Sequence, residues 1–189
     1  ESVKAKGILL PIIVRATSNG NYEILAGHRR VEAARIAGLT EVPCKIMNLN
    51  DDEAVVVMTE TNFCQRSKMS HSEKAKAYQM QMNAYRNQGK RNDLISLVQE
   101  INDLCSNRTQ VEMDESENLV DWCSNRTQVK SRDIIAKLHH TSALQVTRYL
   151  RLNELIEELL EMVDTEQIPF TAGVAISFLT KEEQQIILD

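Results

Sequence analysis

The sequence has 189 residues, of which 42% are hydrophobic, 26% are charged and only 4% are aromatic, and its formal net charge is -5. This length allows one large or two small domains with a real hydrophobic core, and no apolar run is long enough to span a membrane. The four cysteines form no CxxC pair and histidine is sparse, which disfavours a zinc site or a disulfide framework and favours a reduced, cytoplasmic protein. The negative charge argues against general polyanion binding, whereas a local basic face would still allow DNA binding.

The first seventy residues mix strand and helix signals. The stretch from Leu9 to Gly27 predicts a β-hairpin, because two β-rich runs flank the turn sequence SNGN. A helix follows and is closed by Gly38, a residue type typical of helix C-termini. The sequence EVPCKIMN predicts a third strand, and DDEAVVVMTETNF predicts a helix whose acidic start suits the helix dipole.

From Ser70 onward every strong signal is helical. Ser70 and Glu73 form a capping-box pattern at the start of a helix. The next helix has one apolar face, made by Leu94, Leu97, Val98, Ile101 and Leu104. Beyond residue 130 the helical pattern is nearly continuous until Pro169, which precedes two short helices. We therefore expect a mostly helical α+β protein with a small α/β domain at 1–68 and an all-α domain at 69–189.

The segment from about 132 to 152 has the pattern of a helix-turn-helix. A first helix from about Asp133 to His139 would be followed by a break at HHTS, and Ser142 would cap a second helix. The second helix would bury Ala143, Val146 and Leu150. The turn of such motifs usually carries glycine, which tolerates a left-handed backbone, and His140 stands there instead. Two plainly packed helices are the alternative.

The predicted second helix presents a separate polar stripe of Ser142, Gln145 and Arg148, joined by Tyr149. In the major groove, arginine can address guanine, glutamine can address adenine, and serine can address either. Nearby basic side chains that could contact phosphates are those of Arg132, Lys137 and Arg151.

The charge distribution supports this interpretation. Five basic residues and one acidic residue lie between Lys130 and Leu152, whereas nine acidic residues and one basic residue follow from Asn153 onward. A basic DNA-reading unit beside an acidic helical support would direct DNA to one face.

A candidate anion site lies where the second strand meets the following helix, in the sequence AGHRRVEAARIAG. Gly27 would allow close backbone approach, and the free N–H groups and dipole of the helix would favour an anion. Arg29 and Arg30 add guanidinium groups whose fork fits phosphate oxygens. The alternative is that Gly27 only forms a turn and that the arginines are solvated or paired with acids.

A second polar cluster, ETNFCQR, ends the helix that follows the third strand. Glu60 and Asn62 offer a carboxylate and an amide, which are usual partners of Mg²⁺ beside phosphates. Gln65 belongs to the same cluster, and Arg66 would add a phosphate contact. The alternative is an ordinary polar helix end.

Taken together, these stretches resemble the ParB family of bacterial partition proteins, over nearly the whole chain except a repeated segment near its middle. The resemblance is carried by GILLPIIVR with YEILAGHRRVEAARIAGL, then by ETNFCQRSKMSHSEKAKAYQ, and then by SRDIIAKLHHTSALQVTRYLRLNELIEELLEMVDTEQIPF. It implies a sulfiredoxin-like, ParB-like N-terminal domain followed by a helix-turn-helix domain. The variant found on plasmids and mobile elements of Gram-positive bacteria is the most similar. Because the family's C-terminal dimerisation domain is not present here, we expect a fragment of a longer protein.

The resemblance also implies a function. Such a protein would bind CTP and Mg²⁺ in its first domain, hydrolyse the CTP slowly, and bind an inverted-repeat DNA site through the helix-turn-helix. CTP and DNA would close a homodimer into a sliding clamp, and a ParA-type ATPase would then segregate the DNA. The implied nucleotide-binding residues are Gly27, His28, Arg29, Arg30, Asn62, Gln65 and Arg66, with Glu60 and Asn62 at the metal.

This sequence departs from the family pattern at particular positions. His28 replaces the commoner glutamate, and Glu60 and Asn62 are not adjacent. A helix-turn-helix transcriptional regulator that has lost nucleotide binding is therefore the alternative function. A sulfiredoxin enzyme is disfavoured because the phosphate loop lacks cysteine, and a nuclease because no acidic cluster has two-metal spacing.

The heptapeptide CSNRTQV occurs twice, at Cys105–Val111 and Cys123–Val129. Related residues precede both copies, which indicates a tandem duplication of about eighteen residues within a linker at 105–130, where insertions are tolerated. Two cysteines without a nearby histidine cannot complete a zinc site. We interpret the repeat as a linker rather than a binding site.

Overall fold

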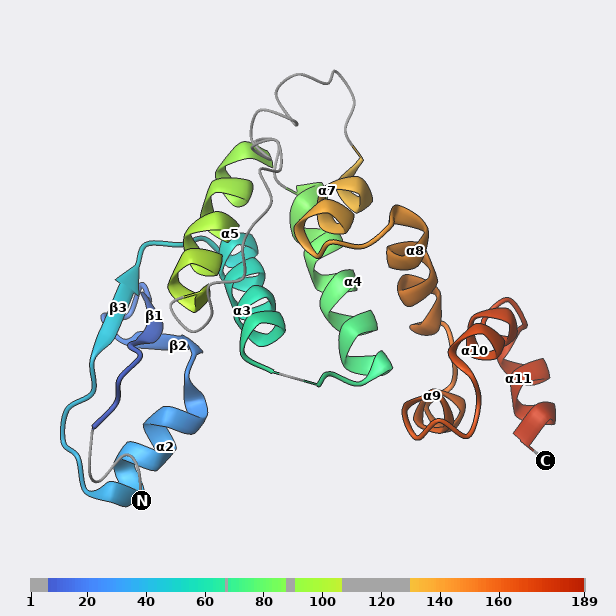
Figure 1. The fold of residues 1–189 in the computed structure, drawn as a ribbon, viewed down its shortest axis with the longest axis horizontal. Coiled ribbons are helices and arrows are strands. Elements are labelled where there is room, and N and C mark those ends of the chain that lie inside the picture. Colours follow the sequence, from blue (N-terminus) through green and yellow to red (C-terminus); the bar gives the residue numbers. More distant parts are fainter. Residues whose placement is uncertain (1–6, 67, 88–90, 107–129, 189) are drawn as a thin grey trace.

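The computed structural model describes residues 7–66, 68–87, 91–106 and 130–188 (Figure 1). A small α/β unit comes first, with β1 (Ile12–Ala16), β2 (Tyr22–Ala26), α2 (His28–Ala37) and β3 (Cys44–Met47). Helices follow, namely α3 (Asp51–Gln65), α4 (His71–Asn87), α5 (Arg91–Ser106), α7 (Ser131–Leu138), α8 (Ala143–Leu152), α9 (Glu157–Asp164), α10 (Phe170–Ile176) and α11 (Lys181–Leu188). The predicted α+β class is confirmed, while the duplicated linker lies almost wholly outside the described residues.

The three strands form one sheet in the order β2-β1-β3, with β1 antiparallel to β2 and parallel to β3. The predicted hairpin and third strand are therefore confirmed. Strand β1 begins at Ile12 rather than at Leu9, since Pro11 has no N–H to donate to a strand partner. The backbone N–H of Ile12 then bonds to the carbonyl of Pro43, which leads into β3.

Two capping boxes fix the start of α3 and the start of α4. At α3 the side chain of Asn50 accepts from the N–H of Glu53, whose carboxylate accepts from the N–H of Asn50. At α4 the predicted box is confirmed, because Ser70 and Glu73 exchange the same pair of hydrogen bonds at 3.1 Å each.

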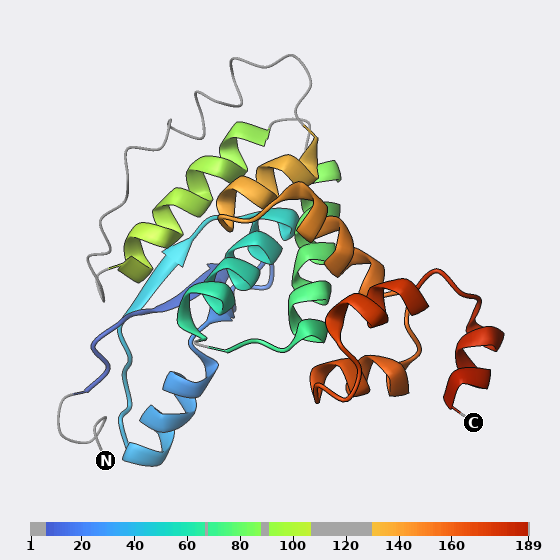
Figure 2. The same cartoon turned by 45° about the vertical axis from the view of Figure 1, so that its right-hand side comes forward.

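One continuous hydrophobic core joins the sheet to the helices. Its buried side chains run from Ile13 in β1 to Val163 in α9, and they include the predicted apolar face of α5 except Leu104, which is partly buried against the core. Helix α3 packs against α4 and α5 as well as against the sheet, as Figure 2 shows. Residues on both sides of position 68 therefore contribute to the same core. The division of the chain into two domains at this position stays a prediction.

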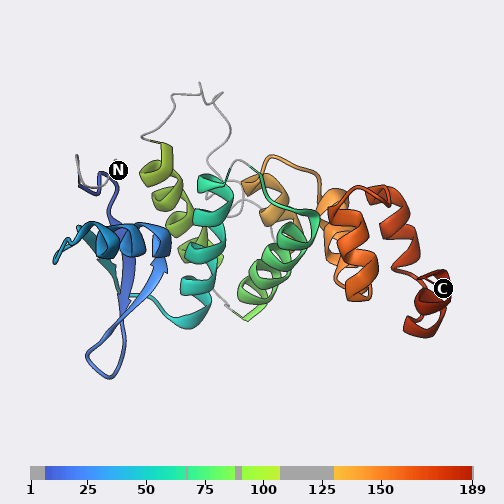
Figure 3. The same cartoon turned by 90° about the horizontal axis from the view of Figure 1, so that it is seen from below.

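The elements succeed one another along an elongated molecule. The sheet and α2 lie at one end and α10 and α11 at the other, with α3, α4, α7 and α8 between them (Figure 3). In the described part of the chain, no helix is both long and apolar enough to cross a membrane.

The helical pattern after residue 130 is less continuous than predicted. Helix α8 ends at Leu152 and α9 begins only at Glu157. The buried side chain of Gln184 in α11 accepts from the N–H of Ile156 at 2.9 Å and donates to the carbonyl of Glu154 at 3.1 Å. The break is thus stabilised by a residue far along the chain, which no local pattern reveals.

Candidate functional site

The N-terminus of α2 is built around Gly27. Its φ of 105° is left-handed, and a Cβ there would lie only 2.7 Å from Cγ2 of Ile12, so both backbone and space require glycine. No side chain caps the helix at Gly27. The N–H of Arg30 bonds to the carbonyl of Gly27 at 2.8 Å. The N–H groups of His28 and Arg29 have no partner within the helix and are candidate donors for an anion, beside their exposed side chains.

Arg30 joins the two motifs that the sequence separates. Its Nη1 donates to the carbonyls of Leu10 and Pro11 at 2.7 Å each, and its Nη2 donates to Oε1 of Gln65 at 3.5 Å. The guanidinium thereby ties the entry to β1 and the start of α2 to the end of α3. The structure thus brings the α2 motif and the α3 motif together, and Arg29 is the more exposed of the two arginines.

The end of α3 adds a polar face to this region. Asn62 and Gln65 are three residues apart and share one side of the helix, whereas Arg66 follows the helix with an extended backbone. Gln65 and Arg66 are exposed and Asn62 is half-buried. Arg66 is already engaged, because it forms an ion pair with Glu73 at the start of α4. We call Gly27, Arg29, Arg30 and Gln65 the outward cluster.

The structure does not bring Glu60 to the outward cluster. Glu60 is 2% exposed, and Gln65 is five positions further along α3, which places the two side chains about 140° apart around the helix. Its Oε1 accepts from Nε2 of Gln81 at 2.7 Å. Among the residues that the structure describes, no group of three or more His, Cys, Asp or Glu could hold a metal. The prediction that Glu60 binds a metal together with Asn62 therefore finds no support in its position.

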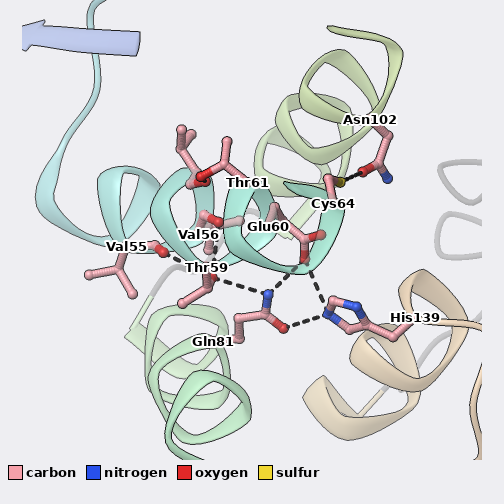
Figure 4. Close-up of polar contacts among 10 residues, drawn as sticks. Val55, Val56, Thr59, Glu60, Thr61, Cys64, Gln81, Asn102 and His139 are labelled. Atoms are coloured by element: carbon pink, nitrogen blue, oxygen red, sulfur yellow. Dashed lines mark hydrogen bonds and ion pairs between the residues drawn. The ribbon is translucent and has the colours of Figure 1, made fainter. Parts of the chain in front are cut away.

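Glu60 belongs instead to a buried junction with Thr59, Gln81 and His139, which joins α3, α4 and the end of α7 (Figure 4). Nε2 of His139 lies 3.0 Å from Oε1 of Gln81 and 3.2 Å from Oε1 of Glu60. Both oxygens are acceptors, so Nε2 carries the proton that they share. Sequence reasoning missed this junction, although Gln81 is a polar residue among the apolar positions of α4.

Aromatic rings enclose the histidine of the junction. The centroid of the His139 ring lies 4.2 Å from that of Phe63 and 5.2 Å from that of Tyr78. Burial raises the pKa of Tyr78 to about 12, with smaller contributions from Tyr149 and from the Glu60 carboxylate. The junction is therefore a packed contact between helices rather than an open cleft.

Helices α7 and α8 are joined by the short turn His139–Ser142. His140 adopts a φ of 48°, so the predicted left-handed position is real although it carries no glycine. Oγ of Ser142 accepts from the N–H of Gln145 at 3.1 Å, which confirms Ser142 as the cap of α8. The first helix begins at Ser131, two residues earlier than predicted.

The polar stripe predicted on α8 is only partly presented to solvent. Arg148 is exposed and makes no hydrogen bond or ion pair within the described part of the chain. Gln145 is half-buried. Tyr149 is 8% exposed and packs on His71 and Phe170, so its assignment to the polar stripe is wrong. Burial raises the pKa of Tyr149, and its hydrogen bond with Gln145 acts in the opposite direction.

The flanking basic side chains differ from one another. Arg132, Lys137 and Arg151 are half-buried. Arg151 donates to the carbonyl of Ser177, and its Cζ lies 4.1 Å from the centroid of the Phe178 ring. Arg151 thus holds α8 against the segment after α10, and a phosphate would have to compete with these contacts.

The chain is similar in sequence and in fold to several known proteins. Residues 1–63 match the family model of the ParB N-terminal domain. A probable chromosome-partitioning protein ParB of Vibrio cholerae is 28% identical over 183 residues, which is 97% of this chain and 47% of that protein. The nucleoid occlusion protein of Geobacillus thermodenitrificans is 43% identical over 77 residues, which is 41% of this chain and 27% of that protein. The chain spans about half, or less, of the length of these relatives.

A solved structure extends the likeness over the whole chain. The C-terminally truncated chromosome-partitioning protein ParB from Caulobacter crescentus, complexed to the centromeric parS site, matches 99% of this chain and 84% of that chain. The TM-score is 0.52 and the sequence identity is 22%, which shows a shared fold. The predicted resemblance to ParB proteins is confirmed by these matches together, with the family model covering residues 1–63 and the solved structure showing the fold alone.

Proposed function

We propose, from the premise that the chain is a ParB-type protein by its N-terminal domain and its fold, that it is a DNA-partition protein that binds an inverted-repeat site. The observation that carries this proposal is Arg148. It stands exposed on α8, the helix after a tight turn, with no hydrogen bond or ion pair to the described residues. The stretch around it, from Lys130 to Leu152, has five basic residues and one acidic residue. An arginine in that position can bind guanine bidentately in the major groove.

The architecture of α7 and α8 suits a helix-turn-helix reading of DNA. In such units the second helix enters the major groove, and residues of its N-terminal half contact base edges. Ser142 fixes the start of α8, and Lys137 lies on the helix before the turn. An inverted repeat would be read by two copies related by a two-fold axis, so we propose a homodimer on double-stranded DNA.

The outward cluster is proposed to hold the triphosphate of CTP. The uncapped N-terminus of α2 supplies backbone N–H donors, Arg29 supplies an exposed guanidinium, and Arg30 supplies a fixed one. His28, Asn62, Gln65 and Arg66 flank this site. Bound CTP would supply a concentrated negative charge that α2 is oriented to receive. For Mg²⁺, Glu60 does not fit, and Asn62 keeps the role of an oxygen ligand beside phosphate oxygens.

The family resemblance extends the proposal beyond these contacts. It includes slow CTP hydrolysis, closure of the homodimer into a sliding clamp, and a ParA-type ATPase as partner. A chain that selected a DNA sequence but bound no CTP would instead favour the transcriptional regulator.

The experiment is selection of DNA duplexes from a random pool by the purified chain, followed by affinity measurement on the enriched sequence. We expect Arg148→Ala to weaken binding by about 1–3 kcal/mol and to relax choice at one base pair. Arg35→Ala is the matched control, because Arg35 is exposed on α2 and pairs with Glu32. Failure of the unaltered chain to enrich any sequence would contradict the DNA-partition function. An equal loss on all sequences would make Arg148 a phosphate contact.

A further inference from the structure

Leu144 is an apolar side chain in an unexpected place. It is 61% exposed at the second position of α8, whereas every other apolar side chain of that helix is buried or half-buried. Single exposed leucines are common on protein surfaces. This one stands on the helix proposed to enter the major groove, and its neighbours on that face are polar or basic.

The geometry of α8 pairs Leu144 with Arg148. Residues four apart lie next to each other on one helical face, so the two exposed side chains form the outward ridge of α8. Gln145 lies off this ridge, since it is half-buried and hydrogen-bonded to Tyr149. The ridge that a ligand meets first is therefore Leu144 with Arg148, rather than the predicted stripe of Ser142, Gln145 and Arg148.

The charge around the ridge identifies the occupant. Helix α8 contains no acidic residue, and the surrounding stretch from Lys130 to Leu152 has five basic residues and one acidic residue. A polyanion fits this surface better than an apolar protein partner does. The apolar feature that DNA presents in its major groove is the C5-methyl group of thymine.

We propose that Leu144 is a specificity-determining residue that reads the methyl group of a thymine in the DNA site. This inference rests on the proposed DNA-binding function. Four residues of helix rise by about 6 Å, and successive base pairs are about 3.4 Å apart. The thymine would therefore lie within about two base pairs of the guanine contacted by Arg148.

The test uses the full 189-residue chain and the duplex that it enriches from a random pool. The same duplex is synthesised with uracil in place of one thymine at a time, which removes only the methyl group. We expect one uracil near the guanine to weaken binding about fourfold, the loss expected for one buried methyl group. Leu144→Ala is expected to bind the thymine and uracil duplexes equally.

Ile36→Ala is the control, because Ile36 is 69% exposed on α2, which lies with the sheet at one end of the molecule and away from α8, and should leave the discrimination unchanged. The inference is overturned if the unaltered chain binds both duplexes equally, or if Leu144→Ala still prefers thymine. If the chain has enriched a sequence, neither of these two results contradicts the proposed DNA-binding function. Enrichment of no sequence at all would remove the function and this inference together. Unchanged thermal melting of Leu144→Ala verifies that the exposed substitution leaves the fold intact.

Discussion

Helix α3 has polar residues on two opposite sides, and the two sides have different surroundings. On one side Glu60 and Thr59 lie in the buried junction, where Gln81 and His139 satisfy them. On the other side Gln65 meets Arg30 at the outward cluster, where Arg29 and the uncapped end of α2 are open to solvent. Residues only a few positions apart in one motif thus face a packed interior and an open surface.

This contrast separates structural polar groups from candidate binding groups. Buried polar atoms must find partners inside the protein, and a satisfied buried network stabilises one arrangement of the helices around it. The buried junction spans α3, α4 and the residue that begins the turn before α8. Groups whose donors remain exposed, such as the guanidinium of Arg29, can gain a partner only from solvent or a ligand. Within the outward cluster, Arg30 is instead held in place by its bonds to Leu10, Pro11 and Gln65.

The largest expected effect comes from breaking the buried junction. Glu60→Ala removes the buried acceptor shared by Gln81 and His139, so Nε2 of Gln81 keeps only Thr59 and Nε2 of His139 keeps only Gln81. We expect the free energy of unfolding to fall by about 2 kcal/mol, measured by urea denaturation. Glu32→Ala, which removes an exposed carboxylate paired with Arg35, should change the free energy of unfolding by less than about 0.5 kcal/mol. Equal effects of the two substitutions would contradict the view that the buried junction stabilises the fold and that exposed ion pairs do not.

A pH titration sharpens the same contrast through Tyr78. Its pKa in the folded state is about 12, above the ordinary value of 10. The resulting stability is therefore present below about pH 10 and is lost as the pH rises toward 12. We compare how far the free energy of unfolding falls between about pH 8 and pH 11. We expect this fall to be about 1 kcal/mol smaller in Tyr78→Phe than in the unaltered chain. Parallel losses in the two proteins would show that Tyr78 ionises as freely as a solvated tyrosine.

A smaller effect is expected at the turn that follows the junction. His140 holds a left-handed backbone that glycine adopts without strain. We expect His140→Gly to raise the free energy of unfolding by about 0.5–1 kcal/mol, since relief of strain exceeds the added freedom of the unfolded chain. His140→Ala should give no such gain in urea denaturation, because alanine keeps the Cβ. A loss of stability in the glycine variant would mean that the His140 side chain stabilises the turn.

Local patterns predicted much of the fold. The hairpin, the Ser70 capping box, the Ser142 cap and the apolar face of α5 all depend on residues near one another in the sequence, and the structure confirms them. The outward cluster was also predictable in part, because Gly27, Arg29 and Arg30 are consecutive or nearly so. The contact between Arg30 and Gln65 is visible only in the folded structure, although the motif resemblance implied that the two motifs belong to one site.

The remaining features depend on contacts between distant residues. Glu60 faces inward because Gln81 and His139, from two other helices, complete its hydrogen bonds. Tyr149 is part of the core because His71 and Phe170 pack on it. Periodicity within one helix shows which residues share a face, but it does not show which face a later helix will cover.

The most direct test of the account is CTP binding measured by titration calorimetry on Arg29→Ala and Glu60→Gln. We expect Arg29→Ala to keep the melting temperature and to weaken CTP binding at least about tenfold, equal to about 1.4 kcal/mol. Glu60→Gln should lower the melting temperature and, while folded, bind CTP as the unaltered chain does. Arg35→Ala should change neither quantity. Unchanged CTP affinity in Arg29→Ala would contradict the assignment of CTP binding to the outward cluster. Lost CTP affinity in folded Glu60→Gln would contradict the purely structural role of the buried junction.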